Sequence, residues 1–411
     1  MRILAIEYAI GGFSREELVE EILLEGYAML RALIEDLRKA GHDVITAVDS
    51  RVLGHCQLMA DQIIAVPKER NPLKLLESYL PHVDGVIVIA PAFKEALYDI
   101  TRFFEEKRVK VLGSTSNAVR ICSNKYITYS VLEKAAVSIP KTLLGYFDED
   151  LESLENKALE LGYPIVMKPV DGVGCAGLSL VRKREELETA VDRIKNEARE
   201  SYFLVQKYLE GEHVSASLIS DGENIVVLAL NAQCIKLGSP EEGSSYEGGY
   251  TPFEHPLKNI AVKEAVKAVK LIDGLRGYVG VDLVITSRGP VVVEINPRLT
   301  TSYLGLREIL NVNIGAEIVK ASLGLEVTTD IRRNGCAIIG KVRFDEDFTL
   351  SSEKIKAIGE MDGVISHILI PKTYLRSGED IAVVVARGKS LEEAKQHFED
   401  IKQEIYEVLS S

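Results

Sequence analysis

The segment at residues 291–298, with the sequence VVVEINPR, constrains the fold of this chain more than any other. Its Val and Ile residues predict a strand. Glu294 and Asn296 lie two residues apart, so both side chains point to one face. A carboxylate and an amide buried without partners would cost folding free energy. The pattern therefore predicts that this face of the strand meets polar groups or a ligand.

A second apolar run, at residues 278–285, carries Asp282, and a Ser-Arg-Gly-Pro turn signal follows it. A hairpin would bring Asp282 close to Glu294 and Asn296, with Arg298 just beyond the second strand. Oxygen ligands suit Mg²⁺, which usually binds one or two carboxylates together with substrate phosphates. The hairpin therefore predicts a magnesium site, and a buried, hydrogen-bonded polar cluster is the alternative.

The composition excludes several classes of protein. A length of 411 residues predicts two or three domains, and a net charge of −13 argues against nucleic acid as a partner. No apolar run approaches the ~18 residues that a membrane helix needs. Because Met1 and Arg2 lead directly into a strand pattern, no signal peptide is expected, and we predict a cytoplasmic protein. The five cysteines form no C-x-x-C pair, so neither a disulfide framework nor a structural zinc site is supported.

Residues 1–115 alternate apolar strands with helices, which predicts a parallel sheet covered by helices. Ligands of such sheets bind at the carboxyl ends of the strands. Glu7, Tyr8, Gly11 and Gly12 occupy that position after the first strand, where they contact a ligand or simply form a turn. The five expected strands are residues 3–7, 44–48, 62–66, 86–90 and 109–112.

Residues 116–325 mix strands and helices less regularly, and residues 202–237 predict an antiparallel meander with a hairpin turn at Asp221-Gly222. The sequence of residues 326–411 predicts a third unit that ends in a helix. The apolar face of this helix packs in the core or forms a subunit contact. Before this helix stands Gly388-Lys389-Ser390. A P-loop would need glycine where Val383 stands, so we predict that Ser390 caps the final helix.

A glycine-rich loop follows an apolar strand that carries Lys168. The loop, residues 171–177, matches G-x-G-x-x-G, but a second apolar strand follows where a dinucleotide-binding motif requires a helix. We therefore predict a flap between two strands, whose backbone N–H groups grip a polyphosphate. Further along, the strand that begins at residue 202 runs into a turn, and its backbone groups are candidates for pairing with adenine.

The order of these features resembles the ATP-grasp superfamily across roughly residues 1–325. The resemblance rests on Asn124-Lys125 before a helix, Lys168-Pro169 before the flap, the hinge at residues 206–209, and the polar hairpin with Arg298. It implies an α/β fold of mixed α+β type: a Rossmann-like parallel-sheet domain at 1–115 and an ATP-grasp domain at 116–325, with a lid at about 140–208. The third unit, 326–411, resembles the small C-terminal α/β domain of carboxylase-type and purine-pathway members.

The resemblance also implies roles for the matching positions. Asp282, Glu294 and Asn296 would hold one or two Mg²⁺ ions, with Mn²⁺ as a substitute, and Arg298 would stabilise the transferring phosphoryl group. Many relatives have Glu at the position of Gln206 and an acid for the ribose at that of His213, so the ribose contact stays open. The positions implied to bind ATP are Lys125, Lys168, Gly172, Gly174, Gly177, Gln206, Lys207, Leu209 and His213.

A narrower resemblance is to the archaeal tyramine–glutamate ligases of methanofuran biosynthesis. It rests on Glu7, Tyr8, Gly11 and Gly12, on the run at 230–233, and on the segment 246–256. The last contains a Tyr-x-Gly-Gly sequence whose alternative interpretation is a surface turn. The residues implied to lie near the substrate are Glu7, Tyr8, Gly11, Gly12, Tyr246, Gly248 and Gly249, and we add Tyr250 and Phe253 as candidates for an aromatic-amine pocket.

These resemblances imply an ATP-dependent carboxylate–amine ligase. The γ-carboxylate of glutamate would be phosphorylated, and tyramine would attack the acyl phosphate to give γ-glutamyltyramine, ADP and phosphate. Phosphoryl transfer needs alignment and charge neutralisation rather than a covalent catalyst, and the chain supplies no Ser-His-Asp set. The alternatives are a ligase for another amino acid or amine, a carboxylase-type enzyme, and a non-catalytic ATP-binding protein. The partners expected are small molecules, with a homodimer as one option.

Overall fold

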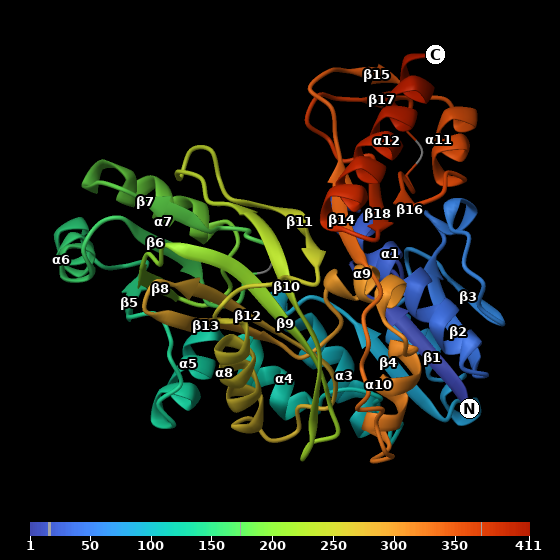
Figure 1. Cartoon of the computed structure of the whole chain (residues 1–411), viewed down its shortest axis with the longest axis horizontal. Coiled ribbons are helices and arrows are strands. Elements are labelled where there is room, and N and C mark those ends of the chain that lie inside the picture. The colour runs from blue at the N-terminus through green and yellow to red at the C-terminus, as the bar shows by residue number, and fades with distance from the viewer. Residues whose placement is uncertain (15–17, 173, 371) are drawn as a thin grey trace.

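The computed structural model describes residues 1–14, 18–172, 174–370 and 372–411, and it begins with a parallel sheet in the order β3-β2-β1-β4 (Figure 1). The predicted fifth strand at 109–112 is wrong. Only Val111 pairs, in one parallel bridge to Val86, before the chain turns away at Gly113. The four strands are β1 (Arg2–Glu7), β2 (Asp43–Asp49), β3 (Gln62–Val66) and β4 (Gly85–Ile89).

Helices cover both faces of this sheet. The long helix α1 (Glu20–Lys39) buries Leu23, Tyr27 and Leu30 against one face, while apolar residues of α3 and α4 pack on the other. Asn124 ends α4 and caps α5, because its side chain accepts hydrogen bonds from the two N–H groups that follow Lys125. The remaining helices of this region are α2 (Pro72–Leu76), α3 (Ala96–Glu106), α4 (Ser116–Ser123) and α5 (Lys125–Lys134).

A separate four-stranded sheet, in the order β5-β8-β6-β7, forms the lid at the left of Figure 1. Leu154 of α6 and Leu187 of α7 pack against Phe203 in a core of its own. The flap prediction is confirmed in its topology, because the glycine loop joins β6 to the antiparallel strand β7. The elements are β5 (Thr142–Tyr146), α6 (Leu151–Leu161), β6 (Ile165–Pro169), β7 (Ser179–Val181), α7 (Leu187–Lys195) and β8 (Tyr202–Lys207).

The predicted meander at 202–237 is only half right. β9 (Gly211–Ser220) and β10 (Ile225–Lys236) form a hairpin around Asp221-Gly222, but β8 pairs with β5 and β6 of the lid. The chain leaves the lid after β8 and enters another sheet at Gly211, where a Cβ would lie 2.3 Å from the carbonyl oxygen of Ile285. A turn that crosses between two sheets looks like a hairpin turn in the sequence.

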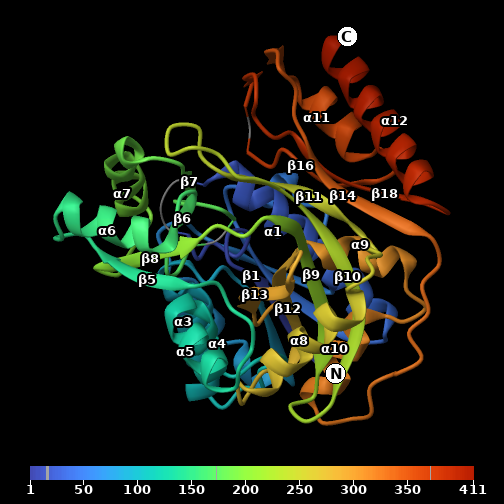
Figure 2. The same ribbon diagram turned by 60° about the vertical axis from the view of Figure 1, so that its left-hand side comes forward.

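The central sheet has eight strands in the order β13-β12-β9-β10-β11-β14-β18-β16. It continues across the expected boundary at 325, because β14 hydrogen-bonds to β11 (Figure 2). Its remaining strands are β11 (Ser245–Thr251), β12 (Gly277–Thr286), β13 (Gly289–Asn296), β14 (Cys336–Val342), β16 (Val364–His367) and β18 (Ala382–Gly388); a small pair is formed by β15 (Phe348–Thr349) and β17 (Tyr374–Leu375).

Helices again cover the central sheet. α8 (Lys258–Lys270) packs on one face, and α9 (Ser302–Ile309) and α10 (Ile314–Ser322) lie with α1 on the other. In the C-terminal unit, α11 (Ser352–Gly359) and α12 (Leu391–Ser410) pack near β16 and β18. Ser390 caps α12 by accepting the N–H of Glu393, as predicted. Among the described residues, no helix is both long and apolar enough to span a bilayer.

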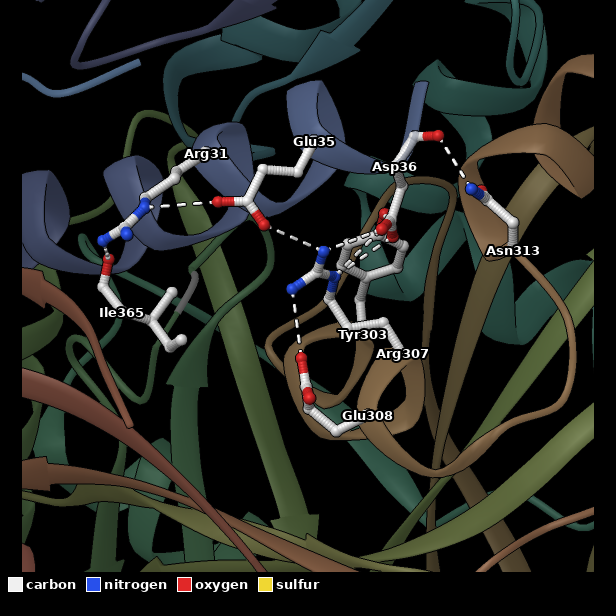
Figure 3. Close-up of polar contacts among 8 residues, drawn as sticks. All are labelled: Arg31, Glu35, Asp36, Tyr303, Arg307, Glu308, Asn313 and Ile365. Carbon is white, nitrogen blue, oxygen red and sulfur yellow. Dashed lines mark hydrogen bonds and ion pairs between the residues drawn. The ribbon is translucent and has the colours of Figure 1, made fainter. Parts of the chain in front are cut away.

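A buried polar cluster ties α1 to α9 (Figure 3). The hydroxyl of Tyr303 donates to Asp36 Oδ2 at 2.5 Å, and Arg307 Nη2 lies 2.7 Å from Asp36 Oδ1 and 3.0 Å from Glu35 Oε2. Asn313 donates its amide to the carbonyl oxygen of Asp36 at 2.8 Å. Because α9 follows directly after residues 298–301, this cluster determines where that segment lies.

Removing the Asp36 charge should destabilise the protein. Asp36→Asn removes the negative charge that partners the buried guanidinium of Arg307. We therefore expect a loss of about 3 kcal/mol of unfolding free energy. Urea denaturation measures this loss. The matched control is Glu106→Gln, which breaks an exposed ion pair with Arg102 and should change stability by less than ~1 kcal/mol. An Asp36→Asn protein as stable as the control would show that the cluster does not hold α1 to α9.

Candidate active site

A cavity of about 250 Å³ lies between the lid and the central sheet, and most of the residues predicted for the site line it. The lid, α5, the β12–β13 hairpin and the start of α9 each contribute to its wall. The sequence-predicted residues that line it are Lys125, Lys168, Gly172, Gly174, Gln206, Lys207, Leu209, His213, Tyr246, Asp282, Glu294, Asn296 and Arg298.

The β12–β13 register brings the three predicted metal ligands together. Asp282 pairs across the strands with Glu294, and Asn296 pairs with Gly280. Asn296 Nδ2 donates to Asp282 Oδ2 at 3.0 Å. Burial and the charge of Glu294 raise the pKa of Asp282 to about 7.

These residues fit a divalent cation, which would relieve the repulsion between the two carboxylates. The described residues contain no cluster of three or more His, Cys, Asp or Glu side chains that could hold a metal. Two carboxylates and an amide oxygen are therefore a partial coordination set. Such a set suits Mg²⁺, which completes its shell with water and substrate phosphates.

Two lysines face the cavity beside the hairpin. Lys125 Nζ lies 3.0 Å from Glu294 Oε1 and donates to the carbonyl oxygen of Gly172 at 2.7 Å. Lys168 is buried, which lowers its pKa, and its ammonium lies 3.5 Å from the hydroxyl of Tyr129. Both cations therefore lie where a polyphosphate between flap and hairpin would offer them anionic partners.

The flap glycines meet different requirements. Gly174 and Gly177 have φ angles of +59° and +69°, which residues with a side chain rarely adopt. A Cβ on Gly172 would lie 2.6 Å from the ring of Pro169. Gly177, at the end of the flap, lies beside Pro169 and Glu197 and is not among the cavity-lining residues. Burial raises the pKa of the flap thiol of Cys175 to about 11, so that thiol stays protonated at neutral pH.

The opposite end of the cavity is lined by the hinge between lid and central sheet. Gln206 donates its amide to Thr142 Oγ1 at 2.7 Å, and Lys207 and Leu209 follow it along the wall. Burial lowers the pKa of His213, which leaves a neutral imidazole able to bond a hydroxyl. This end is therefore less charged than the hairpin end.

The residues after β1 lie outside the cavity-lining set. Gly11 donates its N–H to the carbonyl oxygen of Glu7 at 2.8 Å, and Glu7 Oε2 accepts the N–H of Ile10 at 2.8 Å. Burial raises the pKa of Glu7 to about 8, and its carboxylate packs where Gly26 of α1 has no side chain. In the structure, Glu7 ends β1, and Tyr8, Gly11 and Gly12 lie in the turn that follows it.

The Tyr-x-Gly-Gly segment is a strand, so its interpretation as a surface turn is wrong. Gly248 and Gly249 lie inside β11, and Cβ atoms there would each lie 2.1 Å from a carbonyl oxygen of a neighbouring strand. Tyr246 reaches the cavity, where its hydroxyl lies 2.9 Å from Thr301 Oγ1. Tyr250 and Phe253 instead pack with the core under α8.

Sequence reasoning assigned no role to several residues that line the cavity. Gln233 donates its amide to Asp282 Oδ1 at 3.1 Å, and Asn231 lies two residues before it on β10. This alternation is the signal that revealed Glu294 and Asn296, so it could have revealed Gln233 as well. Glu25 and Met29 of α1 carried no such signal, because a helix that covers a sheet is expected to be amphipathic.

Comparisons with known proteins agree with this geometry. The profile of the ATP-grasp domain matches residues 122–302, and that of the pre-ATP-grasp domain matches residues 42–119. The tyramine–L-glutamate ligase of Methanocaldococcus jannaschii is 32% identical over 311 residues, which are 74% of this chain and 84% of that protein. The chain belongs to the ATP-grasp family. It is a ligase of the class that forms C–N bonds and releases ADP.

Solved structures show the same ATP-grasp fold. Biotin carboxylase from Campylobacter jejuni superposes with a TM-score of 0.71 at 16% identity, over 100% of this chain and 95% of that one. The L-amino acid ligase of Bacillus licheniformis gives 0.69 at 17% identity, over 98% of each chain. At these identities the likeness concerns the fold alone.

Loss of the Gln233 amide should weaken the metal-dependent part of nucleotide binding. In Gln233→Leu, Asp282 loses a donor that orients it, and we expect ADP in the presence of Mg²⁺ to bind about 10- to 100-fold more weakly. Isothermal titration calorimetry measures this affinity. The same titration in EDTA is the control and should give equal affinities for the variant and the wild type. Equal affinities in Mg²⁺ as well would remove Gln233 from the metal site.

Proposed function

We propose that this ligase joins L-glutamate to tyramine. The observation that carries the proposal is the 32% identity to a tyramine–L-glutamate ligase over most of both chains. The cavity supports it, because phosphate-binding lysines, oxygen ligands and the aromatic ring of Tyr246 line one space. The product is γ-glutamyltyramine, with ADP and phosphate.

A carboxylate does not condense with an amine in neutral water, so the reaction begins by phosphorylating the γ-carboxylate. Lys125 and Lys168 hold the phosphates, and the flap backbone closes over them. Asp282, Glu294 and Asn296 would hold Mg²⁺, which would supply positive charge to neutralise the phosphates. Arg298 lies just after the hairpin and stabilises the transferring phosphoryl group.

The closed flap then keeps water away from the acyl phosphate until the amine arrives. Gly172, Gly174 and Gly177 make up this flap, and Lys125 already contacts it through the carbonyl oxygen of Gly172. The adenine lies at the hinge, against Gln206, Lys207 and Leu209, and His213 bonds the ribose. Tyr246 contacts the tyramine ring.

Product analysis tests the chemistry. The purified protein with ATP, Mg²⁺, L-glutamate and tyramine should release one ADP and one phosphate for each amide formed. Coupled ADP detection and mass spectrometry measure the products. Release of AMP and pyrophosphate would refute the acyl-phosphate route. A panel of other acids and amines in the same assay identifies a different substrate pair if glutamate and tyramine give no product.

Replacing one metal ligand should stop turnover without unfolding the protein. In Glu294→Gln, both the metal and Lys125 lose an anionic partner, and we expect kcat to fall by at least about a hundredfold. Steady-state ADP release measures this. Glu133→Gln, an exposed change on the helix that carries Lys125, is the control and should match the wild type. A Glu294→Gln enzyme with normal kcat would remove this residue from the metal site.

A further inference from the structure

Three carboxylates line the cavity among the residues that the structure describes, and one of them does not belong to the β12–β13 hairpin. Asp282 and Glu294 belong to that hairpin. The third, Glu25, comes from α1, together with Met29 one helical turn later. The mechanism above leaves Glu25 without a role.

Glu25 lines the cavity together with Arg298, Thr301 and Tyr246, and the last two contact each other through their hydroxyl groups. Its charge acts on Arg298 and on the Tyr246 hydroxyl, which places it on the side of the reacting groups. His213 lies the other way along the strands, because it pairs with Val284 towards the hairpin turn. The imidazole is therefore poorly placed to serve the same end of the cavity.

A buried cation holds Glu25 in place. Lys341 of β14 lies 2.7 Å from Glu25 Oε1 and 3.5 Å from Asp380 Oδ2, and its side chain is only 13% exposed. The charged and titratable groups that interact with Glu25 are Lys341, Arg298 and Tyr246, and Asp380 and Glu21 interact in turn with Lys341. The ion pair with Lys341 anchors the Glu25 carboxylate at the wall of the cavity.

The chemistry requires such a group. An alkylamine is an ammonium ion at neutral pH and has no free electron pair with which to attack. We propose that Glu25 binds the ammonium group of the amine substrate and accepts its proton before the attack. This inference rests on the proposed ligase function. It means that a residue of the N-terminal unit selects an amine substrate that carries a positive charge. Met29 and Tyr246 supply apolar surface beside that carboxylate.

The proposed step moves two protons and releases one leaving group. One proton passes from the ammonium to the Glu25 carboxylate, and the free amine attacks the acyl carbonyl. The C–N bond forms as the C–O bond to phosphate breaks, and phosphate leaves with the electron pair. The departing phosphate takes the second nitrogen proton, and Glu25 releases its proton to solvent.

Hydroxylamine separates this step from the first one, because it is largely uncharged at neutral pH and traps an acyl phosphate as a hydroxamate. In Glu25→Gln we expect amide formation at neutral pH to fall at least about a hundredfold, while hydroxamate formation stays close to the wild-type rate. The amide rate of the variant should recover as the pH rises and free amine becomes available. Hydroxamate formation also reports that the variant is folded.

Glu20→Gln is the matched control. Glu20 lies on the same helix and pairs with Lys372 of the C-terminal unit, as Glu25 pairs with Lys341, but it does not line the cavity. This control should keep both activities. Equal losses of amide and hydroxamate in Glu25→Gln, no loss of either, or the same loss in Glu20→Gln would each overturn the inference. A wild-type protein that forms no hydroxamate would instead refute the proposed function.

Discussion

The antiparallel register of β12 and β13 is the constraint on which the site depends. It pairs Asp282 with Glu294 and Gly280 with Asn296, so that two carboxylates and an amide share one face of the central sheet. A slip of one residue would turn these side chains to the opposite face. Gly280 permits this register, because a Cβ at that position would clash with the side chain of Thr300 at 2.7 Å.

The hairpin has a function only because other elements meet it. The lid brings Lys168 and the flap, and α5 brings Lys125 to within 3.0 Å of Glu294. The Asp36–Arg307 pair holds α9 against α1, which brings the segment after Arg298 opposite Glu25. The cavity therefore joins the N-terminal unit, the lid and the central sheet. The C-terminal unit adds β14 to that sheet and the Lys341 ammonium to Glu25.

Where sequence reasoning was wrong, tertiary context had overridden a local pattern. Residues 202–207 were predicted as the first strand of a meander, but they pair inside the lid. The alternative interpretation of the two glycines after Tyr246 as a surface turn is also wrong, because they lie in β11, where a Cβ would lie 2.1 Å from a carbonyl oxygen of a neighbouring strand. Both errors concern which partner a strand has, and a one-dimensional pattern does not contain that information.

The sequence by itself indicated most of the elements and the residue types: the alternating strands and helices, the polar face of β13, and the lysine before a glycine flap, from which we predicted a magnesium–nucleotide site. These follow from periodicity and side-chain type, which are local. Only the tertiary structure decided that Gln233 orients Asp282 and that Glu25 reaches the same cavity. It also decided that the turn after β1 lies outside that cavity, since the position of a segment relative to the cavity depends on contacts between parts of the chain far apart in sequence.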